Sequence, residues 1–199
     1  KTFDKFEINN GNRAGALRQQ LLDHAQGKLT VNRVKKSERK RNPSAPFITS
    51  TLQMDASRKL GFSAQRTMRA AQGLYEGVAI DGETQGLITY MRTDSVTLSN
   101  DALADLRGQI KRQFGEDYLP EGPRQFKSKS KNAQEAHEAI RPTSAALTPE
   151  RARKYLREDQ ARLYELIWRR SLASQMMPAR LEQVSVEFDC GAGAVFRAT

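Results

Sequence analysis

Apolar and polar residues alternate near both ends of the chain and recur with helical spacing through its middle. Residues 1–8 and 28–34 show the alternation of half-buried strands, and residues 12–27 between them have the composition of a short helix. The alternation returns over residues 180–190 and predicts a further strand there. Strand-rich ends around a helical middle suggest one domain inserted into another.

The boundary after the first strands is marked by charge. Residues 35–46, "KKSERKRNPSAP", carry five positive charges, one negative charge and two prolines without periodicity. Such a run predicts an exposed connector that leads into a new unit. We therefore expect a β-rich first part over residues 1–45, a helical domain over residues 46–177 and returning strands over residues 178–199.

Two consecutive helices are predicted after the connector. Leu52, Ala56 and Leu60 recur every four residues before a break at Gly61, and Ser63 is a suitable N-cap for the second helix. The apolar face of that second helix is Met68, Ala71, Leu74, Tyr75 and Val78. Two short helices joined at a glycine and followed by a strand suggest a helix-turn-helix or winged-helix arrangement.

Further helices are predicted downstream. Ser99 is the expected N-cap of a helix that ends at Gly115. A short helix is expected to end before Pro142, another to begin at Thr148–Pro149, and the longest helix to run over residues 159–176. The basic segment 118–132 contains proline and glycine and is expected to be an irregular loop.

Composition narrows the class of protein. The 199 residues carry a formal net charge of +10, which is typical of proteins that meet phosphates, although a solvated basic surface is the alternative. No window approaches the roughly 18 apolar residues of a membrane span. One cysteine and two histidines exclude an internal disulfide and a zinc site, so we expect no structural metal and a reducing cytosol.

The first residue and the last strand pattern of the sequence lead to a further expectation. The chain begins at Lys1 without a methionine, and its last strand pattern stops at Thr199. We therefore expect it to be a piece of a longer protein.

The candidate chemistry lies in residues 86–95, "GLITYMRTDS". If the apolar front half is a strand, Tyr90 and Arg92 project from the same face, with Asp94 beyond them. A guanidinium can bridge two phosphate oxygens and favours the phenolate, which suits attack on a phosphodiester. The alternative is a tyrosine that packs its ring beside a surface ion pair between Arg92 and Asp94.

Three segments in order resemble type IA DNA topoisomerases. "GLITYMRTDS" is similar to the active-site motif of that family, and "AHEAIRPT" at residues 136–143 is similar to a second motif downstream. Residues 46–77, "PFITSTLQMDASRKLGFSAQRTMRAAQGLYEG", resemble the family segment that leads up to the tyrosine. The resemblance thus extends over residues 46–143.

The resemblance implies roles for individual residues. Tyr90 would be the nucleophile that becomes joined to a 5′ phosphate, and Arg92 would contact the scissile phosphate. His137 would lie near that phosphate or the DNA backbone, although a histidine beside Glu138 is more often a surface residue. Residues expected to support the same pocket are Thr93, Asp94, Ser95 and Arg141. Backbone contacts are expected from Arg58, Lys59, Arg66, Arg69, Lys127 and Lys129, although for any single one of them a solvated surface position is the commoner case.

The family also implies an architecture and a setting. The fold class would be α+β and mainly helical, with a winged-helix or CAP-like catalytic domain inserted into the β-rich arch of a toroidal enzyme and hinges near residues 35–46 and 176–182. Mg²⁺ would be bound by a toprim domain, whose acidic DxD pattern is absent from this sequence. We accordingly expect no cofactor in this chain and no relaxation of supercoils by the chain alone.

The expected partners are single-stranded or negatively supercoiled DNA and the remaining domains of the same protein. We expect a monomer in the bacterial cytoplasm, at the nucleoid, with no membrane association. No phosphate-cradling GxxxxGK[ST] motif occurs, as expected for an enzyme that needs no ATP.

Other readings remain open. In a non-enzymatic helix-turn-helix module, Arg66 and Arg69 would bind DNA and Tyr90 would be structural. Tyrosine recombinases and type IB enzymes place their nucleophile after an Arg…His-x-x-Arg series, whereas here Tyr90 precedes His137. Within the type IA family, topoisomerase III and reverse gyrase are alternatives to bacterial topoisomerase I.

Overall fold

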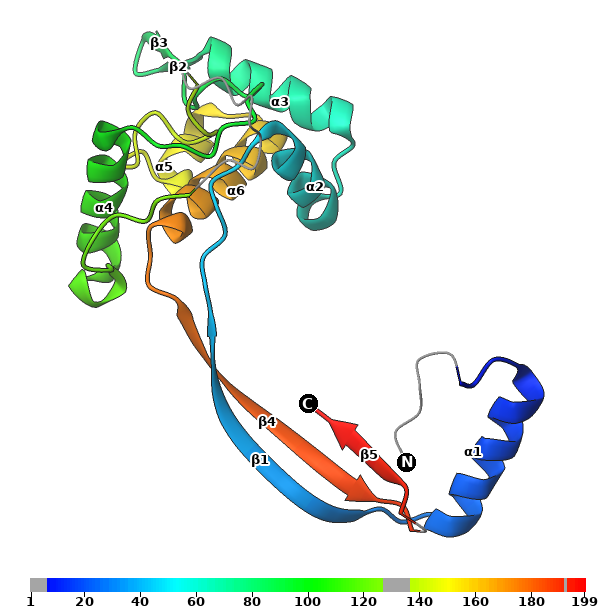
Figure 1. Cartoon of the computed structure of the whole chain (residues 1–199). Coiled ribbons are helices and arrows are strands. Elements are labelled where there is room, and N and C mark those ends of the chain that lie inside the picture. Colours follow the sequence, from blue (N-terminus) through cyan, green and yellow to red (C-terminus); the bar gives the residue numbers. More distant parts are fainter. Residues whose placement is uncertain (1–6, 127–136, 192) are drawn as a thin grey trace. The chain divides into compact units, whose positions relative to one another are not determined.

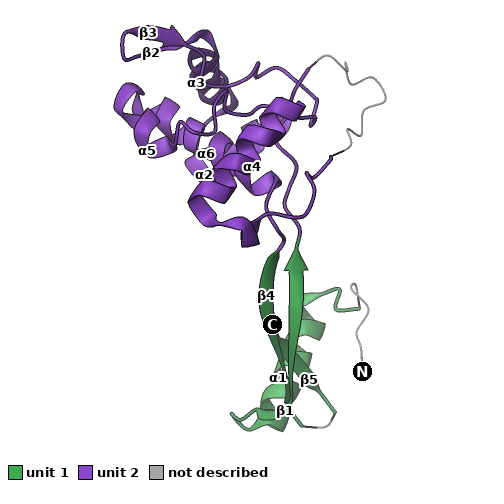
Figure 2. Ribbon diagram, turned by 90° about the vertical axis from the view of Figure 1, so that its left-hand side faces the viewer, with its two compact units in different colours: residues 1–41, 179–199 green, residues 42–178 purple. Residues whose placement is uncertain are grey.

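The computed structural model describes residues 7–126, 137–191 and 193–199. The chain divides into two compact units, one made of residues 1–41 and 179–199 and the other of residues 42–178 (Figure 2). Helices and strands are both present, and most of the helices belong to the second unit. The first unit is therefore assembled from two segments that lie far apart in the sequence.

The first unit combines one helix with an antiparallel sheet (Figure 1). Its described elements are α1 (Gly11–Ala25), β1 (Thr30–Arg41), β4 (Ala179–Asp189) and β5 (Val195–Ala198). The strand order is β1-β4-β5, and the β1–β4 ladder runs from Thr30 opposite Asp189 to Arg41 opposite Ala179. The buried thiol of Cys190 donates to the carbonyl of Leu21 at 3.3 Å and ties the end of β4 to α1.

The sequence prediction was only partly right in this unit. The predicted helix and the C-terminal strand are confirmed as α1 and β4. The connector predicted over residues 35–46 is wrong for residues 35–41, which belong to β1, and only residues 42–46 lack regular structure. The predicted strand at residues 1–8 falls partly outside the described residues, and its described end, residues 7–8, is not a strand.

The exposed, charged composition of β1 explains why residues 35–41 are predicted as a connector and not as a strand. Every residue of β1 is exposed, so neither face imposes the apolar alternation by which a strand is normally found. Backbone pairing with β4 stabilises the strand instead, and charged side chains pair diagonally across the ladder. Lys36 lies 3.6 Å from Glu182, and Arg180 lies 3.9 Å from Glu38.

The second unit is a helical domain with one small hairpin. Its described helices are α2 (Thr49–Leu60), α3 (Ala64–Glu76), α4 (Asn100–Phe114), α5 (Pro149–Ala152) and α6 (Glu158–Ser174). The 3₁₀ turns η1 (Glu116–Tyr118) and η2 (Arg153–Tyr155) and the hairpin of β2 (Val78–Ile80) with β3 (Glu83–Gln85) complete it. Helix α6 packs against α2, α3, α4 and α5 and buries Leu163, Tyr164 and Ile167 among them (Figure 1).

Local signals set the ends of these helices. The hydroxyl of Ser63 accepts from the backbone N–H of Arg66 at 3.2 Å, and that of Ser99 accepts from Ala102 at 3.3 Å. Gly61 ends α2 in the left-handed region, at φ 70°. The predicted helices after residues 47, 63, 99 and 148 and the long C-terminal helix are confirmed.

Two predicted elements are absent from the described residues around the candidate site. Residues 86–90 are not a strand, and residues 137–141 are not a helix. Isolated bridges join Ile88 to Pro142 and Phe47 to Ile140 instead. Leu87 and Ile88 are buried as an apolar strand would be, but their segment bonds to several separate partners, so no continuous ladder forms. None of the described helices is both long and apolar enough to cross a lipid bilayer.

Candidate active site around Tyr90

The segment that carries Tyr90 is fixed on one side by Thr89. The backbone N–H of Thr89 donates to the carbonyl of Arg141 at 2.9 Å. The Thr89 hydroxyl donates to the carbonyl of Ala139 at 2.6 Å and accepts from the N–H of Arg141 at 3.0 Å. The two predicted motifs, residues 86–95 and 136–143, are thereby joined directly next to Tyr90.

Thr49, the first residue of α2, fixes the segment on the other side. Its N–H donates to the carbonyl of Thr93 at 2.9 Å, and its hydroxyl donates to the carbonyl of Met91 at 2.8 Å. The same hydroxyl accepts from the N–H of Thr93 at 2.9 Å. The backbone of Tyr90 therefore lies between two anchors that are far apart in the sequence.

Burial alternates along this segment although no strand forms. Met91 is 0%, Ser95 4% and Thr93 9% exposed, whereas Tyr90, Arg92 and Asp94 are exposed. The extended backbone held by Thr49 is sufficient to place successive side chains on opposite sides. The phenol, the guanidinium and the carboxylate are thus all on the solvent side.

The Tyr90 ring lies in an aromatic cluster and its side chain is 39% exposed. Its ring centroid is 5.3 Å from that of Tyr75 in an edge-to-face arrangement at 61°, and 6.3 Å from that of His137 at 37°. Its hydroxyl makes no hydrogen bond with any residue in the described ranges. No described residue therefore occupies the phenolic oxygen of Tyr90.

Arg92 and Asp94 do not neutralise each other. Within the part of the chain that the structure describes, neither side chain forms an ion pair. The alternative of a surface ion pair between these two residues is therefore wrong. Arg92 instead presents an exposed cation two residues after the phenol.

Arg92 and Asp94 line an open depression of about 520 Å³ at the start of α2. The residues around it are Ile48, Thr49, Ser50, Arg92, Thr93, Asp94 and His137. The first turn of a helix carries unpaired N–H groups and a partial positive charge, so both α2 and Arg92 favour an anion there. A phosphate is the biological anion best matched to a guanidinium of this kind.

Arg141 has a different place from that of Arg92. Its Nη2 and Nε atoms donate to Oε2 of Glu138 at 2.6 Å and 3.1 Å, and its guanidinium does not line the depression as the described residues define it. The other oxygen of Glu138 accepts from the N–H of Ser99 at 2.6 Å. Partial burial raises the pKa of Glu138, but the hydrogen bonds from Ser99 and Arg141 outweigh it, and the net pKa is below the usual value. Glu138 thus links the second motif to the N-cap of α4, and Arg141 holds the Glu138 carboxylate in place.

The hydroxyls of Thr93 and Ser95 are occupied by local turns. Thr93 Oγ1 accepts from the N–H of Ser95 at 3.1 Å, and Ser95 Oγ accepts from that of Thr97 at 3.2 Å. Thr93 lines the depression, whereas Ser95 is buried behind it. These two residues shape the backbone that displays Arg92 and Asp94.

The predicted DNA-binding cations that the structure describes lie elsewhere on the unit. Arg58, Arg66 and Arg69 are exposed on α2 and α3, and none of them is among the described residues that line the depression beside Arg92 and Asp94. Lys59 pairs with Asp55 at 2.8 Å, and the guanidinium of Arg66 lies 4.1 Å from the Phe62 ring centroid. Lys127 and Lys129 lie outside the described residues.

Two contributors were missed by the sequence reading. Tyr75 was assigned to the apolar face of its helix, but it is 41% exposed and packs against Tyr90. The side chain of Thr49 shows no signal in the sequence, because its partners are more than 40 residues away. Only the folded chain brings either residue to the site.

The described residues also offer no site for the metal implied by the family resemblance. Among residues 7–126, 137–191 and 193–199, no three side chains of His, Cys, Asp or Glu are grouped so that they could hold an ion.

Comparison with known proteins assigns the chain to a family. A family model described as DNA topoisomerase matches residues 1–199. The chain belongs to this family. It is similar to DNA topoisomerase 1 of Xylella fastidiosa strain Temecula1, with 53% identity over 200 residues, covering 100% of this chain and 24% of the relative. It is also similar to DNA topoisomerase 1 of Rickettsia prowazekii, with 56% identity over 172 residues, covering 86% of this chain and 22% of the relative.

A solved structure agrees with this assignment. The full-length topoisomerase I of Thermotoga maritima matches with a TM-score of 0.72 and 42% identity, over 99% of this chain and 29% of that one. These relatives place the chain among the bacterial type IA DNA topoisomerases. The chain spans about a quarter of the length of the topoisomerases that it matches.

Proposed function

We propose that this chain supplies the DNA-cleaving tyrosine of a type IA topoisomerase, with Tyr90 as the nucleophile. The observation that carries the proposal is an exposed phenol, without a hydrogen-bond partner in the described ranges, two residues from an exposed and similarly unpaired guanidinium. A tyrosine that only packs its ring does not require either feature.

The chemistry is an exchange of phosphodiesters. The phenolic oxygen of Tyr90 forms a bond to the phosphorus of a single DNA strand, and the bond from phosphorus to the 3′ oxygen of the preceding nucleotide breaks. The proton lost by the phenol balances the one gained by the leaving 3′ hydroxyl. One phosphodiester replaces another, so resealing reverses the same step and needs no nucleotide.

The surrounding residues have supporting roles. Arg92 and the first turn of α2 stabilise the negative charge of the phosphate as it passes between oxygens. His137 and Asp94 border the same phosphate position, and Tyr75 restricts the ring of the nucleophile. Thr49, Thr89 and the pair of Glu138 with Arg141 are positioning residues that act through the backbone.

The wider function follows from the family. We infer that residues 42–178 form the catalytic domain, with α2, α3 and the β2–β3 hairpin in a winged-helix-like arrangement, and that residues 1–41 with 179–199 belong to the arch. The substrate is single-stranded or negatively supercoiled DNA in the bacterial cytoplasm. Relaxation further requires the remaining domains of the full-length protein, including the acidic domain that binds Mg²⁺ in this family.

Covalent capture tests the proposal. The full-length polypeptide that contains this chain is mixed with a single-stranded oligonucleotide and then denatured. A 3′-end label is expected to stay on the protein, whereas a 5′-end label is expected to leave with the free 3′-hydroxyl fragment. Tyr90→Phe is expected to abolish capture with unchanged thermal unfolding.

The same experiment separates the alternatives. Capture of the 5′ label would contradict a 5′-phosphotyrosyl intermediate. DNA binding without capture of either label would favour a non-enzymatic helix-turn-helix module.

A further inference from the structure

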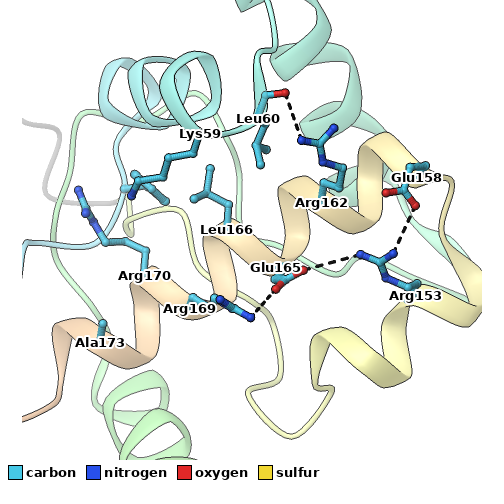
Figure 3. Close-up of a pocket in the computed structure, with 11 residues that line it drawn as sticks. Lys59, Leu60, Arg153, Glu158, Arg162, Glu165, Leu166, Arg169, Arg170 and Ala173 are labelled. Carbon is cyan, nitrogen blue, oxygen red and sulfur yellow. Dashed lines mark hydrogen bonds and ion pairs between the residues drawn. The ribbon is translucent and has the colours of Figure 1, made fainter.

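A second depression, of about 550 Å³, lies between the C-terminal end of α2 and the length of α6 (Figure 3). Its described lining is Phe47, Lys59, Leu60, Arg153, Glu158, Arg162, Glu165, Leu166, Arg169, Arg170 and Ala173. The site described above does not use it, and the described linings of the two depressions share no residue.

Positive charge predominates in this depression, which we call the α2–α6 groove. Among the described residues that line it, five are cations and two are carboxylates. Glu165 contacts Arg169 at 2.6 Å and Arg153 at 3.8 Å, and Glu158 contacts Arg153 at 3.4 Å (Figure 3). One carboxylate is therefore shared between two guanidiniums.

A third carboxylate, Asp55, is also shared. It lies 2.8 Å from Lys59 and 3.7 Å from Arg170. Arg162 has no carboxylate partner in the described part of the chain and donates to the carbonyl of Leu60 at 3.3 Å. Counting Asp55 with the lining, the groove retains an excess of two positive charges, and like charges held together in this way attract anions.

The aromatic residues beside the groove lie against cations rather than open solvent. The guanidinium of Arg170 is 4.6 Å from the ring centroid of Phe47, and Phe62 is flanked by Arg162 at 5.3 Å and Arg66 at 4.1 Å. Phe47 is 0% and Phe62 1% exposed, so neither ring offers a surface on which a base could stack. Recognition here would rest on phosphate and not on base identity.

The groove is also long. Its lining on α6 runs from Glu158 to Ala173, which is about 22 Å at the rise of an α-helix. A free phosphate or a single nucleotide would occupy only part of that length, whereas a strand can present successive phosphates along it.

We propose that the α2–α6 groove binds the phosphodiester backbone of a single DNA strand, without sequence preference, as a second contact apart from the depression beside Arg92 and Asp94. This inference rests on the proposed function for the identity of the polymer. Lys59 then lines this basic surface, and Arg66 lies next to it. The other cations of the surface are Arg153, Arg162, Arg169 and Arg170.

Arg153 and Arg169 are the residues to test, because their side chains are 52% and 70% exposed and their removal leaves the core intact. Binding of a fluorescein-labelled 20-nucleotide oligo-dT to the 199-residue chain is measured by anisotropy over a series of salt concentrations. In R153Q/R169Q we expect affinity at low salt to fall about tenfold and the salt slope to become shallower by about 1.4, as for two lost phosphate contacts to a single strand.

Two further variants make the test specific. R18Q/R112Q removes the same charge from exposed positions outside the described lining and is expected to leave the salt slope within error of the original. Glu165→Gln releases Arg153 and Arg169 from their shared carboxylate and is expected to tighten binding about threefold. Thermal unfolding of each variant checks that the chain remains folded.

The results distinguish the possible occupants. Three results would overturn the proposal. They are an equal loss of oligonucleotide affinity in the two double variants, unchanged affinity in R153Q/R169Q, and no binding of the oligonucleotide to the original chain at low salt. Displacement of the oligonucleotide by micromolar pyrophosphate would identify a site for free phosphates instead. Covalent capture by Tyr90 is measured separately. A negative result for DNA binding by the groove therefore leaves the role of Tyr90 untouched, and a negative result for capture by Tyr90 leaves DNA binding by the groove untouched.

Discussion

The ring of Tyr75 meets the ring of Tyr90 edge to face, with centroids 5.3 Å apart and an angle of 61° between the planes. Tyr75 lies in the last turn of α3, and the backbone of that turn also bonds to the segment before Tyr90, since the N–H of Leu87 donates to the carbonyl of Leu74 at 2.7 Å. The orientation of the proposed nucleophile therefore depends on α3.

Loss of this ring contact should slow cleavage more than it weakens binding. In Tyr75→Leu, the aromatic pair, which contributes about 1 kcal/mol, is lost and the phenol of Tyr90 gains freedom. We expect single-turnover cleavage by the full-length polypeptide to slow by about 10-fold to 100-fold because the nucleophile is misplaced. Tyr75→Phe retains the ring and should cleave at the original rate; equal losses in both variants would contradict a purely positional role.

Gly86 allows the close approach between this segment and α3. A Cβ atom at position 86 would lie 2.7 Å from the backbone oxygen of Tyr75, which is too close to be accommodated without movement. Gly86→Ala should lower the free energy of unfolding by about 1–3 kcal/mol and slow cleavage as well. Gly108→Ala, on α4, is the matched control, because the nearest atom is 3.5 Å away and belongs to the flexible side chain of Arg112. Urea unfolding of both variants measures the difference.

Thr49 provides a second test of positioning. Thr49→Val preserves the shape of the side chain but leaves the carbonyl of Met91 and the N–H of Thr93 without their hydroxyl partner. We expect a loss of about 1–3 kcal/mol in unfolding free energy, together with slower cleavage by Tyr90. Thr49→Ser should restore both properties, and a serine variant as defective as the valine variant would argue against the hydrogen bonds.

The lowered pKa of Glu138 makes the stability of the folded chain depend on pH. The pKa of this carboxylate is lower in the folded chain than its ordinary value of 4.5, so its contribution is fully present above that value and is lost as pH falls through the folded pKa. Glu138→Gln should therefore lower the free energy of unfolding at pH 7. Between pH 7 and pH 3, the variant should lose less of that free energy than the original chain does. Denaturant unfolding at pH 7 and pH 3 checks this; a variant with the original pH dependence would show that Glu138 is not responsible.

The helices of the second unit could be predicted from the sequence because their signals are local. Apolar spacing marks the buried faces, and Ser63 and Ser99 are followed at once by helices whose N–H groups they accept. The motif around Tyr90 was also recognisable, because the residues that carry its chemistry are close together in the chain.

What the sequence could not reveal depends on contacts between distant segments. Residues 35–41 join β1 although no apolar face marks them, and Leu87 and Ile88 are buried although their segment forms no continuous strand ladder. The α2–α6 groove was missed because Arg162 and Arg169 look like the solvated face of a helix until Lys59 is packed beside them.

The identity of the modified residue after DNA capture is the most direct test of the proposed chemistry. Trypsin releases Tyr75 and Tyr90 on the same peptide, residues 70–92, so fragmentation within that peptide must locate the nucleotide adduct. A phosphodiester-linked nucleotide on Tyr90, present with DNA and absent without it, is the expected result. An adduct on Tyr75, or a captured complex in which residues 70–92 are unmodified, would show that Tyr90 is not the nucleophile.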